Sequence, residues 1–191
     1  HPSETIESTK GQSQRRSRRS IPLLYHLPSA PALHPRGVAL DWSASWYLDR
    51  VKLASRWQTE RLVLRCWTGD DAEALRAAID ASAAELRPWI PFMRHEPRTL
   101  EETRAWVRAR IEDHESGIRH FYAVTHEEVL VGEVMLLNGT PIEVPERGYW
   151  IHSHHTRRGY AAEACRRLVA EAVRAGAVAL ELRCSSGNEA S

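Results

Sequence analysis

A short basic turn at residues 155–164 carries the chemistry that is easiest to identify in this sequence. It reads His-Thr-Arg-Arg-Gly-Tyr-Ala-Ala-Glu-Ala, follows an apolar stretch at 148–152 and opens an amphipathic segment over 160–175. A glycine-bearing turn between a strand and a helix presents free backbone N–H groups and the positive end of the helix dipole. The sequence therefore predicts an anion site, and phosphate is the anion that such a turn suits best.

The residue types of the turn agree with this interpretation. Gly159 lets the backbone approach a ligand closely, while Ala161 and Ala162 leave the first helical turn uncluttered. Arg157 and Arg158 add positive charge against phosphate oxygens. The turn has neither the GxxxxGK[ST] spacing of a Walker loop nor the GxGxxG spacing of a dinucleotide turn, so the motif alone does not name the phosphate.

The elements that must position this turn follow from hydrophobic periodicity and from capping signals. Ser/Thr residues followed three positions later by Asp/Glu mark two helix starts, and short alternating or apolar runs mark the strands. Because the helix before 177–184 is a crossover, the strands on either side of it should be parallel neighbours. We expect strands at 61–67, 120–125, 129–137, 148–152 and 177–184, and helices at 68–86, 99–117 and 160–175.

Charge and composition divide the chain into two parts. Residues 1–56 hold nine Lys/Arg against four Asp/Glu, a net charge of +5, and the remainder carries −4. The arginine-rich run and the prolines near the N-terminus predict a disordered or non-family extension at 1–57 and one domain at 58–191. The acidic domain disfavours nucleic acid as its ligand, and no stretch reaches the roughly 18 apolar residues of a membrane span. Three widely spaced cysteines favour reduced thiols and a cytoplasmic location.

Five stretches, at 59–65, 86–91, 148–152, 157–164 and 182–191, occur in one order along the chain. Together they resemble the GCN5-related N-acetyltransferases, and within them the RimJ/RimL-type branch. The resemblance implies an α/β fold of the α+β type, with a mixed, mostly antiparallel central sheet flanked by helices. It also implies acetyl-CoA as the co-substrate, with its pyrophosphate in the turn before the helix at 160–175.

The resemblance assigns the cofactor contacts residue by residue. Thr156 stands where the family pattern has Gln or Arg, which changes little if backbone N–H groups hold the phosphates. Ile151 and His152 are expected to pair through their backbone with the pantetheine amide. The cofactor-binding residues are then Ile151, His152, Arg157, Arg158, Gly159, Tyr160, Ala161, Ala162 and Asn188. No metal site is expected, because His152, His154 and His155 lack an acidic or cysteine ligand at a suitable spacing.

The implied reaction is the transfer of an acetyl group to a primary amine by direct attack in a ternary complex. Glu133 is the candidate general base, directly or through water; the alternative is that it is a solvent-facing strand residue. Asn188 and Ser191 match an Asn-x-x-Ser pattern of the RimJ/RimL-type enzymes, with Ser191 as the candidate acid. In the family this Ser opens a further helix followed by two strands. We therefore expect that helix and those strands to be missing, with the edge beside 177–184 exposed.

Several interpretations stay open at this point. The acceptor is a protein N-terminal α-amine or a small-molecule amine, and a homodimer is possible. A non-catalytic acyl-CoA-binding module or an inactive truncated remnant is the alternative to an enzyme, and a nucleic-acid-binding role of the arginine-rich arm is a weaker one.

Overall fold

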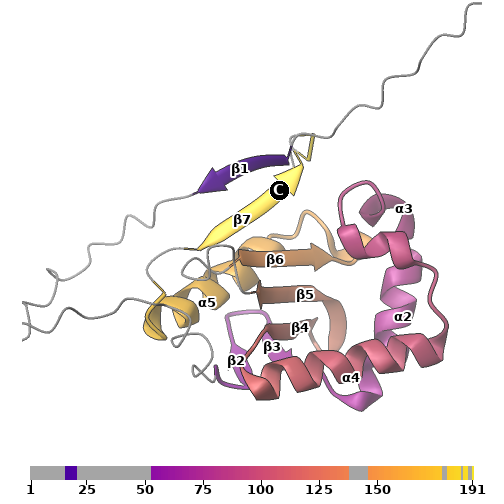
Figure 1. The fold of residues 1–191 in the computed structure, drawn as a ribbon, viewed down its shortest axis with the longest axis horizontal. Coiled ribbons are helices and arrows are strands. Elements are labelled where there is room, and N and C mark those ends of the chain that lie inside the picture. Colours follow the sequence, from indigo (N-terminus) through magenta and orange to yellow (C-terminus); the bar gives the residue numbers. More distant parts are fainter. Residues whose placement is uncertain (1–15, 21–52, 138–145, 178–179, 186, 189–190) are drawn as a thin grey trace, which may run out of the picture.

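A seven-stranded sheet with helices on both faces forms the body of the chain (Figure 1). The computed structural model describes residues 16–20, 53–137, 146–177, 180–185, 187–188 and 191. Its elements are β1 (Arg16–Ser20), β2 (Arg56–Gln58), β3 (Val63–Cys66), η1 (Gly69–Asp71), α2 (Ala72–Ala81), α3 (Ala83–Leu86), η2 (Pro91–His95), α4 (Leu100–Ser116), β4 (His120–His126), β5 (Val129–Leu137), β6 (Glu146–Ile151), η3 (Ser153–His155), α5 (Tyr160–Arg174) and β7 (Glu181–Ser185). No helix within these ranges is long and apolar enough to cross a membrane.

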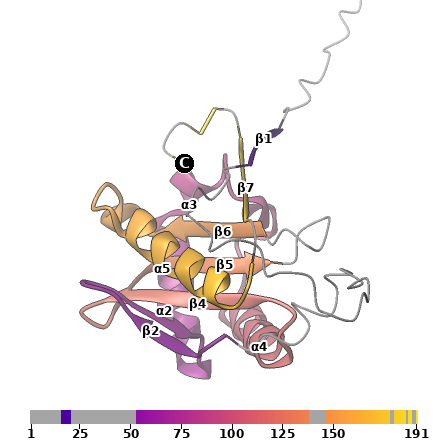
Figure 2. The same ribbon diagram turned by 90° about the vertical axis from the view of Figure 1, so that its left-hand side faces the viewer.

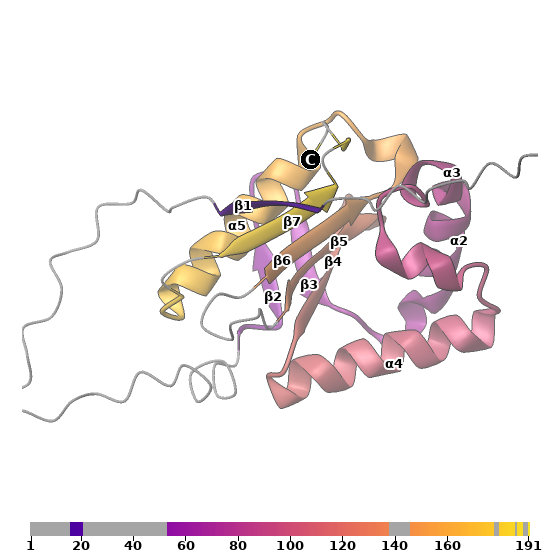
Figure 3. The same cartoon turned by 45° about the horizontal axis from the view of Figure 1, so that its top comes forward.

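The strands lie in the order β1-β7-β6-β5-β4-β3-β2. Every neighbouring pair is antiparallel except β6 and β7, which are parallel. Figure 3 shows the strands in succession from β1 and β7 at one edge. The mixed, mostly antiparallel sheet and its one parallel pair around α5 confirm the predicted fold class.

Two hydrophobic cores hold the layers together, one on each face of the sheet. Figure 2 shows α5 across one face, with α2 and α4 on the other. Strands β4 and β5 lie between the two cores, so six of the seven residues of β4 and six of the nine of β5 are buried. The core under α5 includes Leu64, Tyr122, Val134, Ala164 and Leu168; the core under α2 and α4 includes Leu75, Ile79, Val107, Phe121 and Trp150.

Both predicted capping boxes are present. The side chain of Asp71 accepts the backbone N–H of Thr68 at 2.7 Å, and that of Glu102 accepts the N–H of Thr99 at 2.7 Å. The helix expected over 68–86 is instead divided. It forms η1, α2 and α3, with a break at Ser82, whose fully buried hydroxyl serves the candidate site described below.

Two parts of the expected N-terminal extension belong to the sheet. Arg56–Gln58 pairs with β3, and Trp57 is buried with its ring centroid 4.4 Å from that of Tyr122. Arg16–Ser20 forms β1 and pairs with β7 over five residues (Figure 3). The edge of β7 that we expected to be exposed is therefore covered, since β1 satisfies its backbone hydrogen bonds. Residues 53–55 are also described, with Leu53 buried in the core under α5, and the rest of the extension lies outside the described residues.

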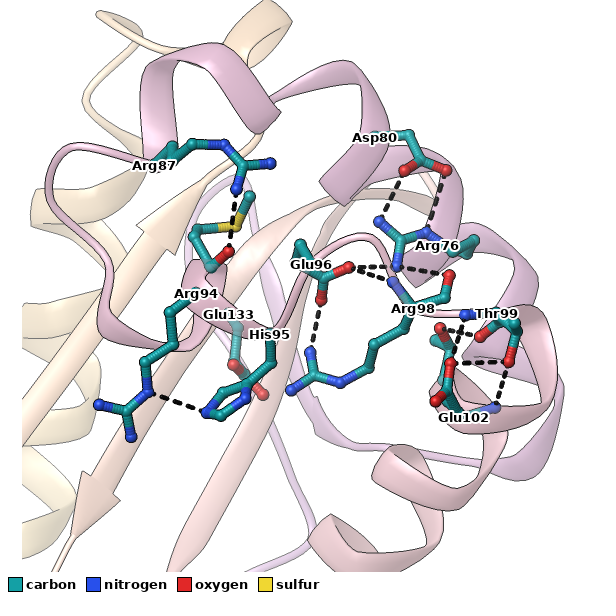
Figure 4. Close-up of polar contacts among 12 residues, drawn as sticks. Arg76, Asp80, Arg87, Arg94, His95, Glu96, Arg98, Thr99, Glu102 and Glu133 are labelled. Carbon is teal, nitrogen blue, oxygen red and sulfur yellow. Dashed lines mark hydrogen bonds and ion pairs between the residues drawn. The ribbon is translucent and has the colours of Figure 1, made fainter.

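A buried carboxylate fixes the segment that joins η2 to α4. Glu96, whose side chain is 2% exposed, accepts a hydrogen bond from Nη1 of Arg76 at 2.5 Å. It also accepts the backbone N–H of Arg98 at 2.9 Å and pairs with the Arg98 guanidinium. Figure 4 shows this Glu96 clamp between the two arginines, with Asp80 bound to the outer side of Arg76. The clamp therefore ties the segment around η2 to α2.

We expect Glu96→Ala to lower the free energy of unfolding by about 3 kcal/mol, because removing one partner of a buried ion pair leaves the other charge uncompensated. Asp80→Ala is the matched control. It removes a carboxylate that is 60% exposed from the same Arg76 and should cost less than about 1 kcal/mol. Urea denaturation of both variants measures the difference, and equal losses would show that the buried clamp contributes no more than a surface ion pair.

Candidate functional site

The turn between β6 and α5 is anchored to both neighbouring layers. His152 donates its backbone N–H to the carbonyl of Val131 on β5 at 2.9 Å, and its own carbonyl accepts the N–H of His155 at 2.8 Å. Ser153 donates its N–H to the hydroxyl of Ser82 at 2.9 Å, and its hydroxyl donates to the carbonyl of Ala81 at 3.1 Å. Ala81 and Ser82, at the break between α2 and α3, thus hold the turn in place through these two hydrogen bonds.

The N-terminus of α5 has the geometry of an anion site. Gly159 is its N-cap in the left-handed region, with φ +79°, and no side chain caps the helix. Because the Glu163 N–H makes the first intrahelical bond, to the Gly159 carbonyl, the N–H groups of Tyr160, Ala161 and Ala162 have no helical partner. They stand at the positive end of a 15-residue helix, as the sequence predicted.

The two arginines of the turn are exposed at this helix end. Arg157 also has left-handed backbone, with φ +60°, and left-handed residues in a turn build concavities that bind anions. Within the described ranges, neither Arg157 nor Arg158 forms an ion pair. The carbonyl of Arg158 accepts Nη1 of Arg61 at 3.1 Å. Both guanidinium groups are therefore available to bind a phosphate.

Glu163 fixes the first turn of α5 to the start of the domain. Its carboxylate accepts the Thr59 hydroxyl at 2.6 Å, the Arg61 N–H at 3.0 Å and Nε of Arg61 at 2.8 Å. Partial burial raises the pKa of this carboxyl, but hydrogen bonds from Thr59 and Arg61 outweigh burial, so the net pKa is lowered. Glu163 therefore stays ionised at neutral pH and serves to position the turn.

Three imidazoles crowd the same turn without forming a metal site. The ring centroid of His152 lies 5.0 Å from that of His154 and 5.2 Å from that of His155. Nδ1 of His152 accepts the His154 N–H, and burial lowers the pKa of His152. Burial, followed by the charges of His152 and Arg158, also lowers the pKa of His155. Among the described residues, no group of three or more potential ligands is placed to hold a metal ion.

Strands β6 and β7 separate soon after they begin. Their pairing is confined to Glu146 with Glu181 and Arg147 with Leu182, and Figure 1 shows the two strands diverging toward their C-terminal ends. A V-shaped gap therefore opens between β6 and β7, next to the N-terminus of α5.

The backbone of β6 faces this gap at alternate residues. Because the N–H of His152 is bonded to β5, the backbone groups of Tyr149 and Ile151 point the other way, toward β7. They are available to an extended ligand lying in the gap. The expected role of Ile151 fits this geometry. That of His152 stays a prediction, and both its N–H and its carbonyl are already bonded within the protein.

A cavity of about 820 Å³ adjoins the gap. Asn188 and Ser191 both line it, as does Tyr149, whose hydroxyl donates to Oγ of Ser191 at 3.0 Å. The N–H of Ser191 donates to the carbonyl of Asn188 at 3.1 Å. The structure thus brings Asn188 and Ser191 to one wall and adds Tyr149, which the sequence analysis missed because strand alternation gives no sign of a contact 42 residues away.

Glu133 occupies a different place from the one we expected. Its side chain is 1% exposed and does not line the cavity. The carboxylate accepts Nε and Nη2 of Arg110 at 2.6 and 3.2 Å, and the indole N–H groups of Trp67 and Trp150 at 2.9 and 3.1 Å. It is therefore not a solvent-facing residue. Each of its two oxygens accepts two hydrogen bonds from protein donors and the side chain does not reach the cavity, which argues against Glu133 as a general base.

Comparison with known proteins agrees with this geometry. The acetyltransferase (GNAT) domain family matches residues 61–191. No curated protein sequence matches the chain significantly. Among solved structures, RimL, a ribosomal L7/L12 alpha-N-protein acetyltransferase in complex with coenzyme A, has a TM-score of 0.64 at 20% identity; the match covers 69% of this chain and 75% of that chain.

Two further structures share the fold. MccE, a microcin C7 self-immunity acetyltransferase in complex with acetyl-CoA and AMP, has a TM-score of 0.64 at 13% identity, covering 69% of this chain and 74% of that one. A putative ribosomal-protein-serine acetyltransferase from Vibrio cholerae has a TM-score of 0.60 at 24% identity, covering 72% and 78%.

The chain belongs to the GNAT acetyltransferase family, which confirms the predicted resemblance. The matching family model is that of an acetyltransferase domain, and the solved structures above share its fold. The RimL structures among its fold neighbours agree with the predicted RimJ/RimL-type branch.

The burial of Glu133 leads to a prediction that distinguishes a structural role of this residue from a catalytic one. We expect Glu133→Gln to lower the free energy of unfolding by about 3 kcal/mol, because Arg110 loses its buried counter-ion. The protein that remains folded should keep its kcat within a few-fold. Urea denaturation and an acetyl-transfer assay on the same preparation measure both quantities.

Replacing both partners, Arg110→Met with Glu133→Leu, is the control, and it should recover part of the lost stability because no unpaired charge remains. A Glu133→Gln enzyme of unchanged stability whose kcat collapses would make Glu133 the base after all.

Proposed function

We propose that this chain transfers the acetyl group of acetyl-CoA to a primary amine, by direct attack of the amine on the thioester in a ternary complex. The observation that carries the proposal is the free N-terminus of α5 beside the gap between β6 and β7. The helix N-terminus suits a pyrophosphate and the gap suits an extended chain with amide groups, and coenzyme A contains both.

The residues present fit the co-substrate at both ends. The N–H groups of Tyr160, Ala161 and Ala162, with Arg157 and Arg158, supply donors and positive charge for the phosphates. The backbone of Tyr149 and Ile151 supplies the edge of a strand along which the pantetheine amides pair. A backbone N–H of this edge then polarises the thioester carbonyl and stabilises the oxyanion that forms on it.

The hydroxyls of Tyr149 and Ser191 form the candidate proton donor. As the tetrahedral intermediate collapses, the carbon–sulfur bond breaks and the departing thiolate needs a proton. Ser191 lines the cavity and is hydrogen-bonded to Tyr149, so its proton passes to the sulfur, and the serine oxygen, supported by the tyrosine hydroxyl, takes up the proton that the attacking nitrogen loses. The backbone carbonyl of Asn188 accepts the N–H of Ser191 and so helps to position the serine.

Cofactor binding is tested first. We expect Arg157→Ala and Arg158→Ala each to weaken CoA binding about tenfold, because each removes a charge-assisted hydrogen bond to phosphate. Arg166→Ala is the matched control, since Arg166 is also exposed on α5 but lies beyond its first turn. Isothermal calorimetry with CoA measures the affinities. Unchanged binding in the double variant would place the phosphates elsewhere.

Catalysis is tested separately. We expect Ser191→Ala to lower kcat roughly 10² -fold without changing the Kd of acetyl-CoA, because only proton transfer is affected. Tyr149→Phe should have a smaller effect in the same direction, and Ser191→Thr should restore most of the activity because it keeps a hydroxyl. Release of free thiol over a panel of amines measures the rates. Acetyl-CoA binding without thiol release for any amine would favour the alternative, a non-catalytic acyl-CoA-binding module.

A further inference from the structure

The cavity that contains Asn188 and Ser191 has two unlike walls. Strands β5, β6 and β7 form one wall, which includes the candidate proton donor. The segment from Arg87 to Arg94 and one face of α4 form the other. At about 820 Å³, the cavity is large enough for a small molecule or a short peptide end beside the thioester.

Arginine dominates the charged side chains around this cavity. Among the residues that the structure describes, six arginines line it, against two carboxylates, those of Asp113 and Glu146. Three of the six are neutralised: Arg110 pairs with Glu133, Arg119 with Asp113 at 2.8 Å, and Arg183 with Glu146 and Glu181 at 3.5 and 3.0 Å. The other three are Arg87, Arg94 and Arg147.

Arg87 and Arg94 stand close together in sequence on this second wall, and the bonds of each go to a group other than a carboxylate. Nη1 of Arg87 donates to the carbonyl of Met93 at 3.2 Å, and Nε of Arg94 donates to the imidazole of His95 at 2.9 Å. Figure 4 shows both side chains on the side of the segment away from the Glu96 clamp, so neither shares its carboxylate. Within the described residues, neither arginine has a carboxylate partner.

The segment that carries them is held in place. The Glu96 clamp fixes its C-terminal end to α2, and Met93 is fully buried between the two arginines in sequence. Apolar surface lies between the charges, since Trp89, Phe92, Trp106 and Trp150 also line the cavity. A ligand that binds this wall is therefore expected to carry negative charge together with groups that can pack against aromatic side chains.

The phosphates of coenzyme A do not account for these arginines. None of the residues from 156 to 162, which form the proposed phosphate site, lines the cavity. We therefore assign the anion that would bind Arg87 and Arg94 to the second substrate, the acetyl acceptor.

We infer that Arg87 and Arg94 select acceptors that carry a side-chain carboxylate near the reacting amine, as in a dicarboxylic amino acid or an acidic peptide N-terminus. The inference rests on the proposed function. A guanidinium binds a carboxylate through charge-assisted, often bidentate hydrogen bonds. The same positive charge lowers the pKa of an ammonium group placed nearby, which favours the neutral amine that attack requires.

The test compares acceptors that differ only in charge. The probes are three peptides, Ser-Glu-Glu-Ala-Ala, Ser-Gln-Gln-Ala-Ala and Ser-Lys-Lys-Ala-Ala, and free glutamate beside free glutamine. Thiol release from acetyl-CoA gives kcat/KM for each. We expect the acidic peptide to exceed its amide counterpart by at least tenfold, mainly through KM, with the lysine peptide the poorest. The free amino acids show whether the acceptor is a metabolite or a peptide end.

The double variant Arg87→Ala with Arg94→Ala should abolish this preference by raising KM for the acidic acceptor, with little change for the amide peptide or in the Kd of CoA. Arg108→Ala is the matched control, because Arg108 is exposed on α4 and does not line the cavity. Equal kcat/KM for acidic and amide acceptors, or a preference that survives the double variant, overturns the inference while leaving the acetyltransferase proposal intact.

If no acceptor is turned over, calorimetry on the protein–CoA complex replaces the assay. Tighter binding of the acidic peptide that is lost in the double variant supports the inference, and equal affinities overturn it. Failure to bind CoA at all is the separate outcome that removes the proposed function.

Discussion

Two parallel strands that are hydrogen-bonded only where they begin create the space on which the site depends. Backbone groups in a sheet are normally paired on both sides, and a strand that loses a neighbour leaves a row of donors and acceptors open. Here β6 keeps β5 on one side, so it stays rigid, while β7 turns away on the other. The crossover helix that follows β6 along the chain begins with N–H groups that are also unpaired. The two sets of free groups together suit coenzyme A.

Much of the surrounding structure serves to keep that edge rigid. Trp150 on β6 donates its indole N–H to Glu133, which also holds Trp67 and Arg110, so strand β6, strand β5 and helix α4 meet at one buried carboxylate. On β5, a side chain at Gly132 would place its Cβ 2.3 Å from the Trp150 carbonyl, so only glycine permits this approach. Beyond the strand, Ser82 and Glu163 hold the turn from two further elements.

Arginines without a carboxylate partner lie at two separate positions, and we assign a different ligand to each position. Arg157 and Arg158 stand at the helix end, where the acidic side chain of the first turn, Glu163, is already bound to Thr59 and Arg61. Arg87 and Arg94 stand across the cavity on the clamped segment. The domain as a whole is mildly acidic, so these arginines are local exceptions rather than part of a general basic surface. Such local charge attracts and orients an anionic ligand over a short range, because salt screens it beyond about 10 Å.

The sequence by itself determined the features that depend on neighbours along the chain. The turn at 155–164, the capping boxes at Thr68 and Thr99 and the parallel crossover follow from spacing alone, because helix caps and strand alternation are local. Contacts between distant segments could not be derived in this way. Glu133 looked like an accessible residue on an alternating strand, and only the packing of helices on both faces buried it beside Arg110. The pairing of Tyr149 with Ser191, the internal bonds of the His152 backbone and the addition of Arg16–Ser20 to the sheet edge were likewise decided by the tertiary structure, since each depends on which strands become neighbours.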